Sequence, residues 1–198
     1  MTALLSALTG DPEIEDLLSD QAQLGAMLAF ERALAEASAD CGFVSAEAAG
    51  AIVAAAASFE PNWAELAAGM ARDGVVVPAL VKQLKAGVPD EHRPALHKGA
   101  TSQDVIDTAL MLQVAKVLGV YETRLSSVLA TLEELAHLHG DKPLMAHTRM
   151  QGGAADELGR EAGELGRAIA AASAGACWDA AEPACHSARR TGWRSREL

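Results

Sequence analysis

The sequence predicts an all-α protein, and three observations support this fold class. No segment keeps a period-two alternation of apolar and polar residues, which is the pattern of a half-buried strand. Alanine is abundant while aromatic residues make up only 4%, a composition that suits closely packed helices. Apolar residues also recur at three-four spacing over residues 104–139, as they do along one face of a helix.

Capping residues predict two helices in the first third of the chain. Asp20 with Gln23 has the spacing of a capping box, and Gly42 follows as the residue that ends the first helix. Ser45 opens a second helix, which continues through a run of alanines to about Ser58.

Two shorter helices are predicted next. The first begins at Pro61 or Asn62 and ends at Gly69. The second has Pro78 at its first position, where a missing N–H costs nothing, and covers residues 80–84.

The longest predicted helix runs from Asp104 to about His139, roughly 54 Å at the rise of an α-helix. Residues 140–143, Gly-Asp-Lys-Pro, end it. Its apolar residues form a coiled-coil-like seam, and further leucines widen the apolar surface. The seam consists of Ile106, Leu110, Val114, Val117, Tyr121, Leu125, Val128, Leu132 and Leu135. A helix of this kind requires packing partners on more than one side.

The start of this helix is a candidate anion site. Thr101 and Ser102 follow Gly99, and Asp104 falls where a side-chain acceptor caps free N–H groups. The free N–H groups and the positive end of the helix dipole then lie beside the two hydroxyls and His97. Such a place binds carboxylates or phosphates. A plain N-cap without a ligand is the alternative for the hydroxyl pair.

Residues 97–109 resemble the first signature of the fumarase/aspartase superfamily, whose members make or break a bond β to a carboxylate. Within it, residues 19–20 with 27–35, 77–84 and 148–151 resemble the 3-carboxy-cis,cis-muconate cycloisomerases. Adenylosuccinate lyases share the hydroxyl loop but usually carry histidine at the position of Arg149. The resemblance implies a small N-terminal helical domain, an incomplete bundle of long helices and a homotetramer.

The resemblance also implies an activity, the lactonisation of 3-carboxymuconate in protocatechuate (β-ketoadipate) catabolism. It implies a small polycarboxylate substrate, no cofactor and a substrate-binding set formed by His97, Thr101, Ser102, Gln103, Thr148, Arg149 and Gln151, with Lys82 as a candidate for a second carboxylate. Arg149 binds carboxylates bidentately but is a poor general acid, because it stays protonated. The alternatives to carboxylate binding are a solvated surface side chain for Lys82 and a helix-end salt bridge for Arg149. No catalytic acid or base is identified.

We expect three regions in this chain. Residues 1–104 form an N-terminal helical domain with the first signature loop, residues 105–151 the first part of a central helical domain, and residues 152–198 a divergent or rearranged tail. The superfamily's third signature, a loop with Ser-Ser-x-Met-Pro, is absent from the sequence. An internal deletion followed by drift, or a frameshift after Gln151, explains the change in composition there.

An impaired cycloisomerase is therefore the expected function. The alternatives are a non-catalytic remnant of that enzyme and another fumarase-type lyase such as adenylosuccinate lyase. The formal charge of −11 and the lack of a basic stripe disfavour nucleic acid as a partner. Three cysteines without a CxxC pair favour neither a disulfide framework nor a metal site. No apolar run reaches membrane-spanning length, so we expect a cytoplasmic protein.

Overall fold

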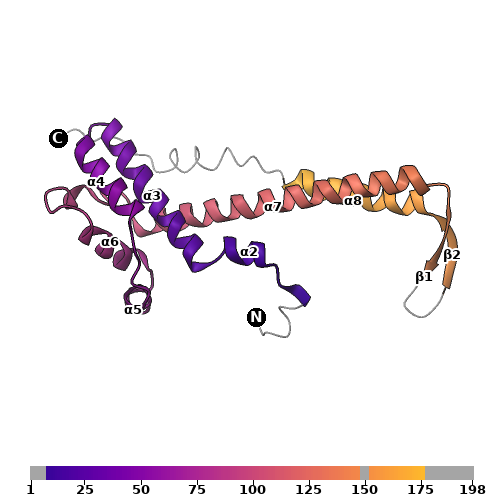
Figure 1. Ribbon diagram of the computed structural model, residues 1–198, viewed down its shortest axis with the longest axis horizontal. Helices are drawn as coiled ribbons and strands as arrows, with labels where there is room; N and C mark the ends of the chain where they lie inside the picture. The colour runs from indigo at the N-terminus through magenta and orange to yellow at the C-terminus, as the bar shows by residue number, and fades with distance from the viewer. Residues whose placement is uncertain (1–7, 148–151, 177–198) are drawn as a thin grey trace. The chain divides into compact units, whose positions relative to one another are not determined.

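The computed structural model describes residues 8–147 and 152–176 (Figure 1). Helices make up most of these residues, and the one sheet is a two-stranded hairpin, so the all-α prediction is confirmed. The chain divides into two compact units between Lys116 and Val117. The division predicted from the sequence, with boundaries at residues 104 and 151, remains a prediction.

The first unit contains the short helices and the beginning of the long one. They are α2 (Pro12–Leu17), α3 (Asp20–Asp40), α4 (Ala46–Ala57), α5 (Trp63–Asp73), α6 (Val77–Ala86), the 3₁₀ turn η1 (Arg93–Ala95) and the start of α7 (Ser102–His139). A side-chain oxygen caps each of the first four helices by accepting the N–H three residues on. The capping residues are Asp11, Ser19, Ser45 and Asn62.

The two ends of α3 differ in how well the sequence predicts them. Its cap is Ser19, whereas the sequence predicted a capping box that begins at Asp20, so that start is displaced by one residue. Its end is confirmed, because Gly42 adopts a φ of 74° directly after the helix. The N–H of Gly42 and that of the next residue bond to the carbonyls of Ala39 and Ser38, which is the Schellman arrangement.

The predicted end of α5 at Gly69 is wrong. The helix continues to Asp73 and ends at Gly74, which has a φ of 74°. Gly69 has a packing role instead, since a Cβ there would lie 2.4 Å from the Cβ of Ala79 on α6. Pro78 is the second rather than the first residue of α6, where it still displaces no helical hydrogen bond.

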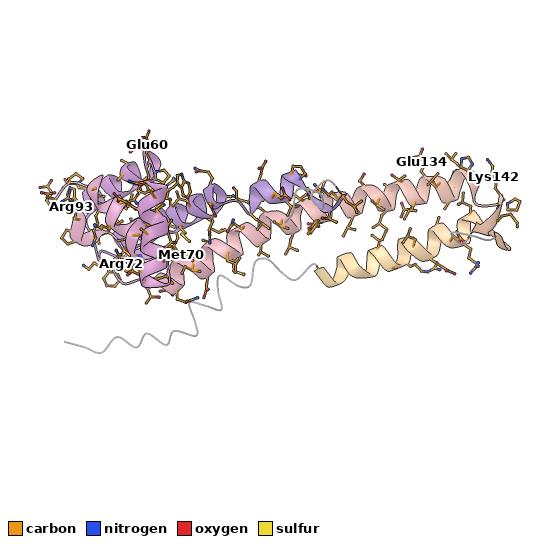
Figure 2. The ribbon with its side chains drawn as sticks, turned by 90° about the horizontal axis from the view of Figure 1, so that it is seen from below. Glu60, Met70, Arg72, Arg93, Glu134 and Lys142 are labelled. Carbon is orange, nitrogen blue, oxygen red and sulfur yellow. The ribbon has the colours of Figure 1, made fainter. Side chains whose placement is uncertain are left out.

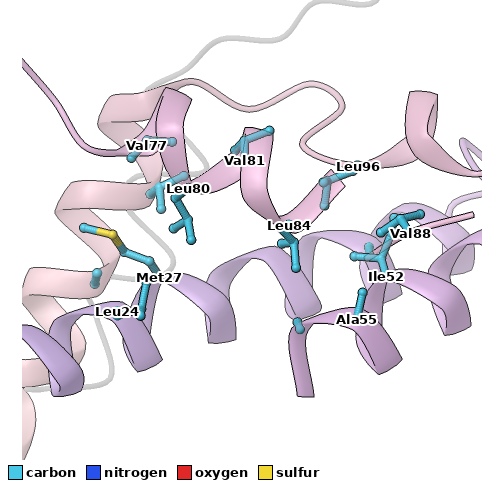
Figure 3. Packing of buried hydrophobic residues seen from close by; sticks show 14 of the residues in the cluster. Leu24, Met27, Ile52, Ala55, Val77, Leu80, Val81, Leu84, Val88 and Leu96 are labelled. Atoms are coloured by element: carbon cyan, nitrogen blue, oxygen red, sulfur yellow. The ribbon is translucent and has the colours of Figure 1, made fainter. Parts of the chain in front are cut away.

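The hydrophobic core of this unit lies between α3, α4 and α6 (Figure 3). Leu24 and Met27 of α3 face Leu80 of α6, and Ile52 of α4 faces Leu84. Full burial of each such side chain stabilises the fold by about 1.5–3 kcal/mol. Two residues of α7, Val105 and Ala109, belong to the same cluster and are completely buried. The core therefore fixes the N-terminal end of α7.

The second unit consists of the rest of α7, a hairpin and α8 (Leu158–Ala176), which runs antiparallel beside α7 (Figures 1 and 2). The strands β1 (Pro143–His147) and β2 (Gly152–Glu157) pair antiparallel. The sequence did not predict them, because their residues have low strand propensity and the pairing itself holds them. After the hairpin the chain packs closely, and a Cβ at Gly159 would lie 2.9 Å from the Cα of Gly140.

Much of the apolar surface of α7 is not covered by the part of the chain that the structure describes. Only Val105, Ala109 and Gln113 are buried along its 38 residues. The exposed large apolar residues of α7 are Leu110, Met111, Leu112, Leu118, Tyr121, Val128, Leu135 and Leu138. Within the described residues, no helix is long and apolar enough to cross a membrane.

Candidate carboxylate-binding site

The loop between η1 and α7 is fixed at both ends. Leu96 is buried before it and Val105 after it, so apolar packing sets where the loop leaves the core and returns. In between, the ammonium group of Lys98 donates to the carbonyl of Phe43 over 3.2 Å. Gly99 has a φ of 85°, in the left-handed region that favours glycine. The loop is thus held in one conformation by contacts to other parts of the first unit.

His97 lies in this loop and contacts a buried carboxylate. Its φ of 57° is left-handed, which is uncommon for a residue with a Cβ. Its Nδ1 atom lies 2.6 Å from Oε1 of Glu31, which projects from α3. Glu31 is only 1% exposed, and its second oxygen, Oε2, has no hydrogen-bond partner in the described structure. Burying a carboxylate costs free energy unless it is paired, and Glu31 has one partner. The short contact to His97 is therefore needed to offset that cost.

Thr101 and Asp104 form a capping box at the start of α7. Oδ2 of Asp104 accepts the N–H and the hydroxyl of Thr101, each over 2.7 Å. The Thr101 hydroxyl in turn accepts the N–H of Asp104 over 3.3 Å. The two hydrogen bonds from the Thr101 side chain and backbone lower the pKa of Asp104; the charge of His97 acts in the same direction, and partial burial opposes them.

The capping box changes the role of the two hydroxyls. The proton of the Thr101 hydroxyl is committed to Asp104, so Thr101 has no proton left to donate to a ligand. The Ser102 hydroxyl is partly exposed and takes no part in the hydrogen bonds of the described residues. The N–H groups of Ser102 and Gln103 belong to the first turn, where the helix itself supplies no acceptor. Ser102 and these two N–H groups are the available anion donors.

The other predicted site residues that the structure describes do not take part in the hydrogen bonds that hold the loop and the capping box. Gln103 is exposed and its side-chain amide donates to Asp107 over 2.6 Å, one turn along α7. Lys82 is exposed on α6, and the hydrogen bonds of the described loop do not reach it. Thr148, Arg149 and Gln151 lie outside the described residues. The structure therefore places His97, Thr101, Ser102 and Gln103 in one loop and the helix start that follows it, and the binding role of all eight residues remains a prediction.

A groove of about 680 Å³ in the first unit is not the carboxylate site. Gln103 and Ile106 of α7 line it together with α3 and α5, and its walls are mostly apolar. Asp20 is its only charged lining residue, and Trp63 and Met70 form part of its wall. Without a cation, this groove does not suit a polycarboxylate. The anion donors lie at the helix start instead.

Chemically, the helix start is suited to holding negative charge. Hydroxyl and N–H donors fixed in advance stabilise charge that develops on carboxylate oxygens, typically by about 3 to 4 kcal/mol per donor. The positive end of the α7 dipole adds to this attraction. Among the described residues, no three His, Cys, Asp or Glu side chains come together as a metal site.

Glu31 is the residue of this site that sequence reasoning missed. By its spacing alone, Glu31 falls on the same helical stripe as Met27 and Ala35. The available signal was its charge, because a carboxylate on a buried helical stripe needs a partner. That partner, His97, lies 66 residues further along the chain, and the sequence spacing could not identify it.

Comparison with known proteins identifies the family. A family model described as a lyase matches residues 10–165, most of the chain. The chain belongs to this lyase family of the fumarase/aspartase superfamily. This confirms the resemblance found in residues 97–109 and in the helices around them.

Several relatives in this lyase family are cycloisomerases. The chain is 38% identical over 168 residues to the 3-carboxy-cis,cis-muconate cycloisomerase of Pseudomonas putida, covering 82% of this chain and 40% of that protein. The crystal structure of the 3-carboxy-cis,cis-muconate lactonizing enzyme from the same organism superposes with a TM-score of 0.78 at 33% identity, covering 88% and 41%. Trans-aconitate decarboxylase 1 of Mycosarcoma maydis is 34% identical over 147 residues, covering 74% and 30%. This chain thus spans about 40% of the length of these cycloisomerases.

Proposed function

We propose that this lyase-family chain is a 3-carboxy-cis,cis-muconate cycloisomerase-like protein that supplies the carboxylate-binding part of the site and turns over slowly by itself. The observation that carries the proposal is the start of α7, where the hydroxyl of Ser102 and two N–H groups remain available in the segment that follows His97. The substrate class is a small polycarboxylate with three carboxylates, as in 3-carboxymuconate.

The reaction builds negative charge on carboxylate oxygens. Lactonisation adds a carboxylate oxygen across a C=C bond and delivers a proton to the carbon α to another carboxylate. The intermediate resembles an enolate dianion, and its extra charge is spread over that second carboxylate. Ser102 and the N–H groups of Ser102 and Gln103 stabilise this charge when the carboxylate lies at the α7 N-terminus.

His97 and the second signature complete the carboxylate contacts. His97 binds a carboxylate through the ring nitrogen that Glu31 does not contact. Thr148, Arg149 and Gln151 contribute further contacts, and the guanidinium of Arg149 pairs bidentately with a carboxylate. Lys82 is a candidate for the remaining carboxylate. We also infer a cytoplasmic homo-oligomer, a tetramer as in the family.

The Ser-Ser-x-Met-Pro loop is not among these 198 residues, so we expect these residues by themselves to turn over the substrate slowly. Loss of one proton-transfer group lowers a rate by about 10²- to 10⁴-fold. Loss of a loop that closes over the site removes the exclusion of water as well.

A second candidate function is a non-catalytic remnant. The exposed apolar face of α7 favours it, since this face requires covering that the described residues do not provide. The relatives also include a decarboxylase of trans-aconitate. A fumarase-type lyase that acts on another polycarboxylate is therefore the third candidate function.

Loss of the ultraviolet absorbance of 3-carboxymuconate tests the proposal, with the Pseudomonas putida cycloisomerase measured in parallel. We expect turnover by this chain to be several orders of magnitude slower than by the full-length relative, while the substrate still binds. Turnover at a comparable rate would show that the missing loop is not needed. Absence of binding, with the fold intact, would favour the remnant.

A further inference from the structure

The buried carboxylate of Glu31 has a role that its position in the core does not explain. Its neighbours one turn away on the same face of α3, Met27 and Ala35, are buried apolar residues, and an apolar side chain at position 31 would pack there without a polar cost. Glu31 is 1% exposed, and Oε2 has no partner among the described residues. Among the described residues, the one polar contact of Glu31 joins its Oε1 to Nδ1 of His97, over 2.6 Å.

His97 is held in a conformation that its own backbone disfavours. A φ of 57° is sterically costly for a residue with a Cβ, so other contacts maintain it. Leu96 before it is buried, and Lys98 after it donates to the carbonyl of Phe43. The imidazole is 19% exposed, and it reaches Glu31 from this fixed backbone.

We propose that Glu31 is a positioning residue that fixes the tautomer and the ring orientation of His97. The carboxylate of Glu31 accepts a hydrogen bond from Nδ1–H, so the proton stays on Nδ1, and Nε2 is the ring nitrogen open to a ligand. A substrate carboxylate at Nε2 requires a proton on that nitrogen too. The negative charge of Glu31 then balances the imidazolium between the two carboxylates. The role in substrate binding rests on the proposed function; the control of the tautomer does not.

The ring nitrogens of His97 report this role directly. Nuclear magnetic resonance of ¹⁵N-histidine-labelled protein distinguishes the two neutral tautomers, and a His97→Asn variant assigns the signals. We expect neutral His97 to be the Nδ1–H tautomer. An Nε2–H tautomer in the unaltered protein would overturn the proposal without any further variant.

Two substitutions at position 31 separate positioning from packing. Glu31→Leu fills the space without an acceptor, and we expect His97 to lose its Nδ1–H preference while the protein still melts cooperatively. Glu31→Gln keeps an acceptor oxygen but no charge, so the Nδ1–H tautomer should persist. Glu36→Gln, an exposed change on the same helix, is the matched control and should alter nothing. An unchanged tautomer in folded Glu31→Leu would contradict the proposal.

Titration with propane-1,2,3-tricarboxylate tests the link to binding. We expect both ring nitrogens of His97 to be protonated in the complex, and Glu31→Gln to weaken binding by roughly tenfold through loss of the balancing charge. If the tricarboxylate does not bind although Nδ1–H is populated, the proposed function fails and the control of the tautomer stands. Equal binding by folded Glu31→Gln would remove the proposed role of the charge.

Discussion

One carboxylate oxygen of Asp104 accepts hydrogen bonds from both donor groups of Thr101 at the start of α7. Oδ2 lies 2.7 Å from the amide nitrogen and 2.7 Å from the hydroxyl oxygen. The same hydroxyl accepts the N–H of Asp104, so the box is reciprocal. This leaves Ser102 as the hydroxyl available to a ligand, although the two residues are adjacent and resemble each other chemically.

Asp104→Ala is expected to reduce the free energy of unfolding by about 1 kcal/mol at neutral pH, the usual contribution of a helix cap. Urea denaturation of both proteins measures it. Asp107→Ala is the matched control, because it removes a carboxylate one turn further along α7 without disturbing the box. An equal effect of both changes would assign the stabilisation to general charge rather than to the cap.

The stabilisation by Asp104 should also decrease as the pH falls. Its pKa is lower in the folded protein than in the unfolded chain, because Thr101 donates two hydrogen bonds to its carboxylate. The contribution is therefore fully present above about pH 5, and it is lost as the pH falls through the folded-state pKa. Denaturation curves of the unaltered protein and Asp104→Ala should converge at low pH. A difference that persists there would contradict the assignment.

Two glycines in helices should respond oppositely to alanine. Gly69→Ala places a Cβ 2.4 Å from the Cβ of Ala79, so we expect destabilisation by about 1 to 3 kcal/mol from overpacking. Gly50→Ala on α4 meets no atom within 4 Å and should stabilise by about 0.5 to 1 kcal/mol through helix propensity. Thermal melting measures both. Stabilisation by Gly69→Ala would mean that α5 and α6 are further apart than described.

The sequence predicted the helices well where capping chemistry is local. Ser45 and Asn62 begin α4 and α5, and Gly42 follows α3, as the sequence indicates. Gly69 was misread because its reason for being glycine lies on another helix, in the contact with Ala79. Sequence spacing reports positions along one helix and not the distance to the next.

The position of the candidate site could be predicted from the sequence, but the separate roles of its residues could not. The hydroxyl pair and Asp104 were placed at a helix start, and α7 begins there. The sequence did not separate Thr101 from Ser102, because that distinction depends on which hydroxyl Asp104 engages. It also missed Glu31, whose partner His97 comes from a distant segment.

Association of the chain should depend on the apolar face of α7. Leu118 and Tyr121 are 40% and 44% exposed, and burial of such side chains between copies contributes about 25 cal/mol per Å². We expect oligomers by sedimentation, and Leu118→Gln should weaken association by roughly tenfold. Lys116→Gln, an exposed polar change nearby, is the control. A monodisperse particle of 20.5 kDa with a cooperative melt would show that this face needs no partner.

The two adjacent hydroxyls should contribute unequally to carboxylate binding. Ser102→Ala removes a donor to a charged group, so the Kd for propane-1,2,3-tricarboxylate should rise by roughly tenfold or more. Thr101→Val also removes a hydroxyl, but one that Asp104 already engages. It should lower the free energy of unfolding and have the smaller effect on the Kd. Calorimetric titration of both folded variants decides between them. A larger loss of affinity in Thr101→Val would assign the ligand contact to Thr101.

The most direct test of the proposed carboxylate site is an amide nuclear magnetic resonance titration with 3-carboxy-cis,cis-muconate. If the site is at the α7 N-terminus, the N–H signals of Ser102 and Gln103 shift most and saturate together, and Ser102→Ala weakens the response. Shifts confined to the apolar groove around Trp63 and Met70, or none at saturating ligand with the fold intact, would contradict a carboxylate site at the start of α7.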